Sequence, residues 1–146
     1  MQIETCGADQ LAQWVALRIA LWPDADREIM AREAPGMLAG PDLLVRLACE
    51  AGRAVGFVEA SIRRDYVNGC ENSPVAFVEG IYVVPEKRGC GVARGLIAAV
   101  ETWAREQGVK ELASDALLDN APSHAMHQAL GFSETERVVY FRKLLA

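Results

Sequence analysis

One junction constrains the fold more than any other feature of the sequence: a long apolar run, a glycine-containing loop and an amphipathic helix follow one another directly. Residues 75–84 are apolar on both faces, which is typical of a central strand. Pro85 stops this run, and apolar residues recur at helical spacing from Val92 until Gly108. Glycine lets a backbone approach a ligand closely, and the first turn of a helix presents N–H groups to anions. The junction therefore predicts a pyrophosphate-binding loop.

Other phosphate-binding motifs fit this loop poorly. No Gly-Lys-Ser/Thr sequence follows the glycines, and the spacing of the dinucleotide fingerprint is absent. A P-loop kinase is therefore disfavoured. A glycine-containing loop without a ligand remains an alternative when this motif is considered alone.

The remaining segments alternate between helical and strand-like patterns. The predicted helices cover residues 11–21, a segment capped by Asp24 or Asp26 that ends near Leu38, and a segment from Asn120 to Leu130. The predicted strands cover residues 2–6, 43–49, 54–62, 111–114 and 138–143, in addition to residues 75–84. This order predicts an α/β (α+β) fold in a single domain spanning residues 1–146, with a mixed central sheet of about six to seven strands flanked by about four helices.

The composition excludes several classes of function. The 146 residues carry a net charge of −5, which argues against nucleic-acid binding and suits a cationic ligand. The four cysteines lack the spacing of a metal site, and His124 and His127 have no third partner that would complete one. No apolar run is long enough to cross a membrane and no signal peptide is evident, so we expect a cytoplasmic protein without a bound metal.

The loop sequence Arg88-Gly89-Cys90-Gly91-Val92-Ala93 resembles the Arg/Gln-x-x-Gly-x-Gly/Ala signature of the GNAT acetyltransferases. A second element of that family, from Asn120 to Leu130-Gly131-Phe132, follows about thirty residues later. The resemblance implies the GNAT fold and acetyl-CoA as co-substrate. The residues that it assigns to acetyl-CoA binding are Ile81, Val83, Arg88, Gly89, Cys90, Gly91, Val92, Ala93 and Asn120.

A closer resemblance is to the aminoglycoside 6′-N-acetyltransferases. It covers most of the chain and rests on Leu21-Trp22-Pro23, residues 59–63, residues 65–69, Ser73-Pro74, Glu79-Gly80-Ile81, Ala113-Ser114-Asp115 and residues 127–132. It implies acetyl transfer to the 6′-amine of an aminoglycoside antibiotic, and a homodimer. Many GNAT members carry a tyrosine four residues before the Gly-Phe pair, proposed as the acid that protonates the CoA thiolate. His127 occupies that position here, so the identity of the acid does not follow.

Two carboxylates are the leading candidates for amine recognition and proton transfer. Glu79 lies within an apolar strand, where a carboxylate is costly unless it is paired or functional. Asp115 closes a strand, whereas Asp119 is better explained as a helix cap. We expect Glu79, or else Asp115, to take the proton from the attacking amine, and both to face ammonium groups. A buried glutamate satisfied by a local partner is the alternative for Glu79.

Three further residues are candidate substrate contacts. Trp22 and Tyr66 are suited to stacking on sugar rings or to cation–π contacts, with ordinary packing as the alternative. Glu71 lies in the same polar loop as Tyr66 and is either a substrate contact or a solvated charge.

The resemblance implies direct transfer in a ternary complex. Backbone N–H groups near Val83 would stabilise the oxyanion, and His127 or water would protonate the thiolate. The alternatives are a GNAT enzyme for another small-molecule or protein amine, and a non-catalytic acyl-CoA-sensing module.

Overall fold

The computed structural model describes residues 1–146, and its five strands form one sheet in the order β1-β2-β3-β4-β5. The strands are β1 (Gln2–Thr5), β2 (Leu43–Glu50), β3 (Arg53–Arg63), β4 (Val75–Val83) and β5 (Leu112–Ser114). Neighbouring strands are antiparallel from β1 to β4, whereas β4 and β5 are parallel. The predicted mixed sheet is confirmed, but it has five strands in place of the expected six or seven.

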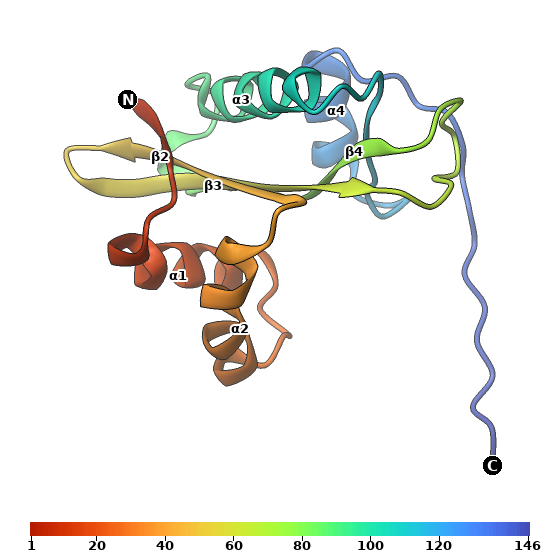
Figure 1. The fold of residues 1–146 in the computed structure, drawn as a ribbon, viewed down its shortest axis with the longest axis horizontal. Coiled ribbons are helices and arrows are strands. Elements are labelled where there is room, and N and C mark those ends of the chain that lie inside the picture. The colour runs from red at the N-terminus through yellow and green to blue at the C-terminus, as the bar shows by residue number, and fades with distance from the viewer.

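Helices cover both faces of the sheet (Figure 1). Helices α1 (Leu11–Leu21) and α2 (Arg27–Ala39) lie on one face, and α3 (Val92–Glu106) and α4 (Ala121–Ala129) lie on the other. The predicted number of helices is confirmed. Asp26 is the residue that caps α2, because its carboxylate accepts hydrogen bonds from the N–H groups of Glu28 and Ile29 at 2.9 and 3.1 Å.

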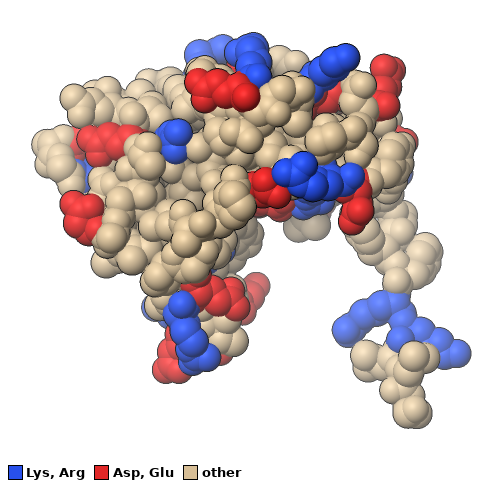
Figure 2. All heavy atoms as spheres, in the orientation of Figure 1, with Lys and Arg blue, Asp and Glu red and all other residues tan.

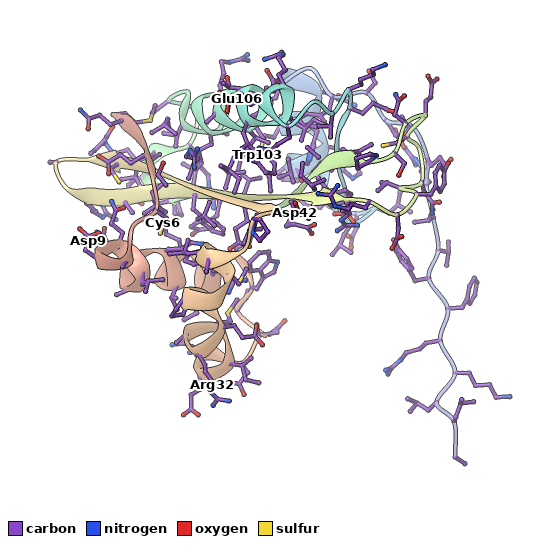
Figure 3. All side chains as sticks on the ribbon, viewed as in Figure 1. Cys6, Asp9, Arg32, Asp42, Trp103 and Glu106 are labelled. Atoms are coloured by element: carbon purple, nitrogen blue, oxygen red, sulfur yellow. The ribbon has the colours of Figure 1, made fainter.

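The apolar stripe of α3 forms one side of the core. Leu96 and Val100 are fully buried, and Trp103 points from the helix toward the sheet (Figure 3). On the opposite face of the sheet, Trp14 of α1 is also fully buried. The helical spacing of apolar residues in the sequence therefore identified both packing faces correctly.

Strand β4 has a β-bulge on one edge and only a short pairing with β5 on the other, and together they leave an opening in the sheet. The register between β3 and β4 shifts after Glu59: Glu59 pairs with Gly80 and Ala60 pairs with Val78, so Glu79 is the extra residue of a β-bulge. A bulge re-aims the side chain it carries, and bulges are frequent beside active sites. On its other edge, β4 pairs with β5 only from Ala76 to Val78. Beyond Val78 the two strands diverge, and this edge of β4 has no neighbouring strand.

The C-terminal segment differs from prediction. Residues 138–143 were expected to form a last strand, but they form none in this chain. The segment extends away from the domain (Figure 1) and leaves Tyr140 and Phe141 86% and 92% exposed. A strand needs a paired neighbour, and residues 138–143 pair with none of the five strands.

The surface carries mixed charge. Figure 2 shows acidic and basic side chains interspersed over the visible face, without a continuous basic patch. No helix has both the length and the apolar character needed to span a membrane.

Candidate active site

A pocket of about 180 Å³ opens where β4 and β5 diverge. Its wall combines the bulged part of β4, the end of β5, the end of α1 and one face of α4. The lining residues are Leu21, Trp22, Val78, Glu79, Gly80, Ile81, Ser114, Asp115, Ala116, Asn120, Ser123 and His127. Six residues singled out in the sequence therefore lie together: Trp22, Glu79, Ile81, Asp115, Asn120 and His127.

Glu79 is held as a carboxylate by three hydrogen bonds. Ser61 Oγ donates to its Oε1 at 2.6 Å, and Arg63 donates to both oxygens at 2.9 and 2.8 Å. Partial burial opposes ionisation, but the hydrogen bonds from Arg63 and Ser61 outweigh it, so the pKa of Glu79 lies below its ordinary value. A carboxylate with a lowered pKa is a strong partner for cations and a weak proton acceptor. This arrangement favours an electrostatic role over general-base catalysis.

Arg63 connects Glu79 to neighbouring groups. Its guanidinium lies over the ring of Phe77, 3.5 Å from the centroid. The hydrogen bond to Glu79 is the main cause of the raised pKa of Arg63, and the charge of Asp115 contributes further. Asp115 lines the same pocket as Glu79, so two carboxylates face this space, and one of them is paired with Arg63.

Trp22 forms part of the pocket wall and packs against the bulge. An added Cβ on Gly80 would lie 2.5 and 2.7 Å from two carbon atoms of the Trp22 ring, so the indole rests directly on the backbone of the bulge. Only glycine permits this close approach. Trp22 also meets Phe57 edge to face, with a centroid separation of 6.2 Å. The sequence suggested stacking for Trp22, and the structure places its ring at the pocket.

A buried ion pair between Arg18 and Glu59 lies next to Trp22, and it was not among the predicted features. Arg18 of α1 lies 5.3 Å from the ring centroids of both Trp14 and Trp22. Arg18 Nε and Trp14 Nε1 both donate to Oε1 of Glu59, which is only 2% exposed. Burial raises the pKa of Glu59 even though Arg18 opposes the shift. Glu59 could have been found from the sequence, because it is a charged residue within an apolar strand, as Glu79 is.

Ser114, His127 and Ser123 form a hydrogen-bonded chain along the pocket wall. His127 Nδ1 lies 2.7 Å from the carbonyl oxygen of Ser123, and His127 Nε2 lies 2.7 Å from Ser114 Oγ. Phe132 packs edge to face against the imidazole, with a centroid separation of 5.2 Å. The two serines carried no sequence signal of their own, because their meeting depends on how α4 packs beside β5.

The glycine loop has the geometry expected of an anion site. Gly89 and Gly91 have φ angles of 76° and 84°, in the left-handed region that favours glycine, and Gly91 directly precedes α3. The first helical hydrogen bond runs from the Gly95 N–H to the Gly91 carbonyl at 3.1 Å. The N–H groups of residues 92–94 therefore have no helical partner and face the loop.

Charge in this loop is distributed unevenly. Lys87 is paired with Glu50 at 2.6 Å, so it offers less positive charge to an anion than a free lysine would. Arg88 is anchored by its Nε donating to the Val83 carbonyl at 2.9 Å, with its guanidinium 5.3 Å from the Tyr82 centroid. The Cys90 side chain is exposed, so this residue contributes to the loop chiefly through its backbone.

Some predicted residues lie outside the pocket. Tyr66 is 67% exposed in the loop between β3 and β4, and the backbone N–H of Glu71 donates to Glu111 at 2.9 Å. Asn120 lines the pocket and also caps α4 by accepting a hydrogen bond from the Ser123 N–H at 3.2 Å. The cap expected at Asp119 is therefore wrong by one residue. No group of three or more His, Cys, Asp or Glu side chains is arranged to hold a metal.

Known proteins resemble this chain over most of its length. Residues 9–132 match the acetyltransferase (GNAT) family. An aminoglycoside N(6′)-acetyltransferase type 1 from Acinetobacter baumannii is 51% identical over 144 residues, which cover 98% of each chain. A second, from Stenotrophomonas maltophilia, is 53% identical over 132 residues, which cover 90% of this chain and 85% of the relative.

Solved structures agree over the full length. The crystal structure of an aminoglycoside antibiotic 6′-N-acetyltransferase from Acinetobacter haemolyticus has a TM-score of 0.94 at 46% identity and covers 100% of both chains. Another 6′-acetyltransferase was solved with the bisubstrate analogue CoA-S-monomethyl-acetylneamine. It has a TM-score of 0.94 at 44% identity and covers 99% of this chain and 98% of that one.

Proposed function

Because the chain belongs to the acetyltransferase (GNAT) family, it is an acetyl-CoA-dependent N-acetyltransferase, and we propose that it acetylates the 6′-amine of aminoglycoside antibiotics. The observation that carries this proposal is a pocket lined by the carboxylates Glu79 and Asp115, which opens where β4 and β5 diverge. The same strand β4 continues into the glycine loop that precedes α3. The relatives that bear the name aminoglycoside N(6′)-acetyltransferase match the chain over nearly its whole length.

The residues around the glycine loop fit a co-substrate that carries phosphates. The free N–H groups that begin α3 and the guanidinium of Arg88 would hold the pyrophosphate of acetyl-CoA. The unpaired edge of β4 at Ile81 and Val83 offers backbone groups to the rest of the molecule. When bound, acetyl-CoA supplies the activated acetyl group. The N–H groups along this edge would stabilise the oxyanion that forms during transfer.

The acidic side of the pocket fits an amino sugar. Glu79 and Asp115 would attract ammonium groups, and their attraction is strengthened by partial removal from water. Trp22 would pack against a sugar ring or an ammonium group. Tyr66 and Glu71, which lie outside the pocket, remain proposed contacts for the distal part of a large substrate.

Proton removal from the amine is needed because such amines are mostly protonated near neutral pH. The expectation that Glu79 acts as the base is weakened by its lowered pKa and its three donors. We assign to Glu79 the task of holding the ammonium group at the acetyl carbon. Asp115 remains the second candidate for the base that takes the proton from the amine, directly or through a water molecule.

The function is tested by CoA release from acetyl-CoA with kanamycin, tobramycin and gentamicin, beside spermidine and a peptide amine. Rapid release with the aminoglycosides only is the expected result. Release with another amine only would overturn the substrate, and CoA binding without turnover with any amine would favour an acyl-CoA-sensing module.

We further propose a homodimer in which the C-terminal segment pairs with a second copy. Residues 138–145 expose several apolar side chains, and an extended segment without a paired neighbour tends to pair with another chain. Sedimentation of the full chain should give a dimer, and the pair of substitutions Tyr140→Asp and Phe141→Asp should give a monomer. A wild-type monomer at micromolar concentration would contradict the proposal.

A further inference from the structure

Two side chains of the pocket wall, Ser114 and His127, meet in a way that no expectation from the sequence included. Ser114 is the last residue of β5 and pairs in register with Val78, immediately before the strands diverge. His127 is on the last turn of α4. Their Oγ and Nε2 atoms are 2.7 Å apart, and both residues line the pocket that contains Glu79.

The hydrogen bonds fix the direction of the protons. The carbonyl oxygen of Ser123 only accepts, so the His127 nitrogen 2.7 Å from it must carry the hydrogen: Nδ1 is protonated. In the neutral ring, Nε2 is then an acceptor, and the Ser114 hydroxyl donates to it. Ser114 Oγ has no other hydrogen bond, which leaves its lone pairs available to a donor in the pocket. The arrangement is therefore ready to receive a proton from a bound amine.

We propose that Ser114 is a catalytic residue that, with His127, carries the proton of the attacking amine to the sulfur of CoA. The inference rests on the proposed acetyl transfer. It concerns the neutral amine, after the ammonium group has released its first proton to solvent.

The step balances in atoms and charge. The amine nitrogen forms a bond to the acetyl carbon and becomes positively charged. An N–H bond then breaks as its proton passes to Ser114 Oγ, while the proton of Ser114 passes to His127 Nε2. The C–S bond breaks with its electron pair on sulfur. The imidazolium returns its proton through Ser114 to the thiolate, so the products are the amide and CoA-SH, and both side chains return to their starting state.

His127 has well-defined surroundings for this task. Its polar neighbours are Ser114 on β5 and Ser123 on α4, and Phe132 covers one side of its ring. The charged groups at the same pocket are Glu79 on β4 and Asp115, which follows β5. Both are carboxylates, so no cationic side chain lines the pocket beside His127.

The experiment compares substitutions that keep the packing with substitutions that remove the proton path. Ser114→Ala should lower kcat by about 10²-fold, the usual contribution of a positioned proton-transfer group, with little change in KM for acetyl-CoA. Ser114→Thr, which retains a hydroxyl, should restore most of the rate. His127→Gln retains an acceptor for the Ser114 hydroxyl but takes up no proton, so it should lower kcat as strongly as Ser114→Ala.

Three further readouts separate proton transfer from a structural role. The double variant should be no slower than either single one, because residues that act as a unit are non-additive. The solvent deuterium isotope effect on kcat should be large in the wild type and smaller in Ser114→Ala. Nitrogen NMR of the free protein should show His127 protonated at Nδ1 and not at Nε2 when neutral.

Near-wild-type turnover of His127→Gln, or an Nε2-protonated neutral tautomer, would overturn the shuttle. These failures are distinguishable from failure of the proposed function. The tautomer is measured without substrate, and the comparison of variants requires only that the wild type releases CoA with an aminoglycoside.

Discussion

Removing Arg18 tests whether the buried pair beneath the pocket is a structural requirement. Glu59 is 2% exposed and Arg18 is 8% exposed, so Arg18→Met would leave a buried carboxylate with only the hydrogen bond from Trp14. Loss of one partner of a buried ion pair costs about 3–5 kcal/mol, because the remaining charge is desolvated without compensation. We expect the free energy of unfolding to fall by about this amount at neutral pH.

The magnitude should depend on pH in a defined direction. Burial already raises the pKa of Glu59, and loss of Arg18 removes the main influence that lowers it. Protonation relieves the buried charge, and a raised pKa in the folded state means that stability is lost as pH rises through that pKa. The defect of Arg18→Met should therefore be largest at neutral pH and shrink as pH falls toward the ordinary pKa of glutamate.

Urea unfolding followed by tryptophan fluorescence measures these changes at several pH values. The double variant Arg18→Met with Glu59→Gln should recover most of the lost stability, because glutamine is neutral and still accepts from Trp14. Arg64→Met is the control: it breaks the ion pair with Asp42, whose side chains are 66% and 44% exposed, and should have a much smaller effect. A defect in Arg18→Met as small as the control, or one independent of pH, would refute this account of the pair.

Three other substitutions test separate parts of the site. Gly80→Ala should displace the Trp22 ring, because an added Cβ would lie 2.5 Å from it. KM for the aminoglycoside should rise while KM for acetyl-CoA stays unchanged, as measured by steady-state kinetics in both substrates. Gly91→Ala forces alanine to a φ of 84°, so the free energy of unfolding should fall by about 1–2 kcal/mol and KM for acetyl-CoA should rise. Thermal unfolding and steady-state kinetics measure the two effects. Gly36→Ala, within α2, is the control and should stabilise the protein. Glu79→Gln should raise KM for the aminoglycoside. It should also reduce the loss of stability on acidification, because a carboxylate with a lowered pKa contributes stability at neutral pH that is lost as pH falls through that pKa. An unchanged KM for the aminoglycoside would contradict the role assigned to Glu79.

Local patterns in the sequence predicted much of the fold correctly. The apolar face of α3, the strands β2 and β3, and the glycines before α3 were all predicted from short-range spacing, and the structure has them. The final strand was predicted from the same kind of pattern, at residues 138–143, and does not form. A strand depends on a neighbour, and spacing within one segment carries no information about whether that neighbour exists in the same chain.

The site was predictable only where a residue type was unusual in its local setting. Glu79 was conspicuous as a charge in an apolar strand, and Glu59 had the same signal but was overlooked. The bulge that turns Glu79 toward the pocket depends on the register of two strands, which the sequence does not reveal. The contact between Ser114 and His127 depends on how α4 is placed beside β5, so neither its distance nor its proton direction followed from the sequence.

The position of the new acetyl group tests the central claim most directly. The protein is incubated with acetyl-CoA and either kanamycin or an aminoglycoside whose 6′ carbon carries a hydroxyl in place of the amine, and the products are analysed by mass spectrometry and two-dimensional NMR. A single acetyl group on the 6′-nitrogen of kanamycin, with no amide formed on the 6′-hydroxyl compound, is the predicted result. Equal acetylation of both compounds, or an acetyl group on another nitrogen of kanamycin, would contradict it.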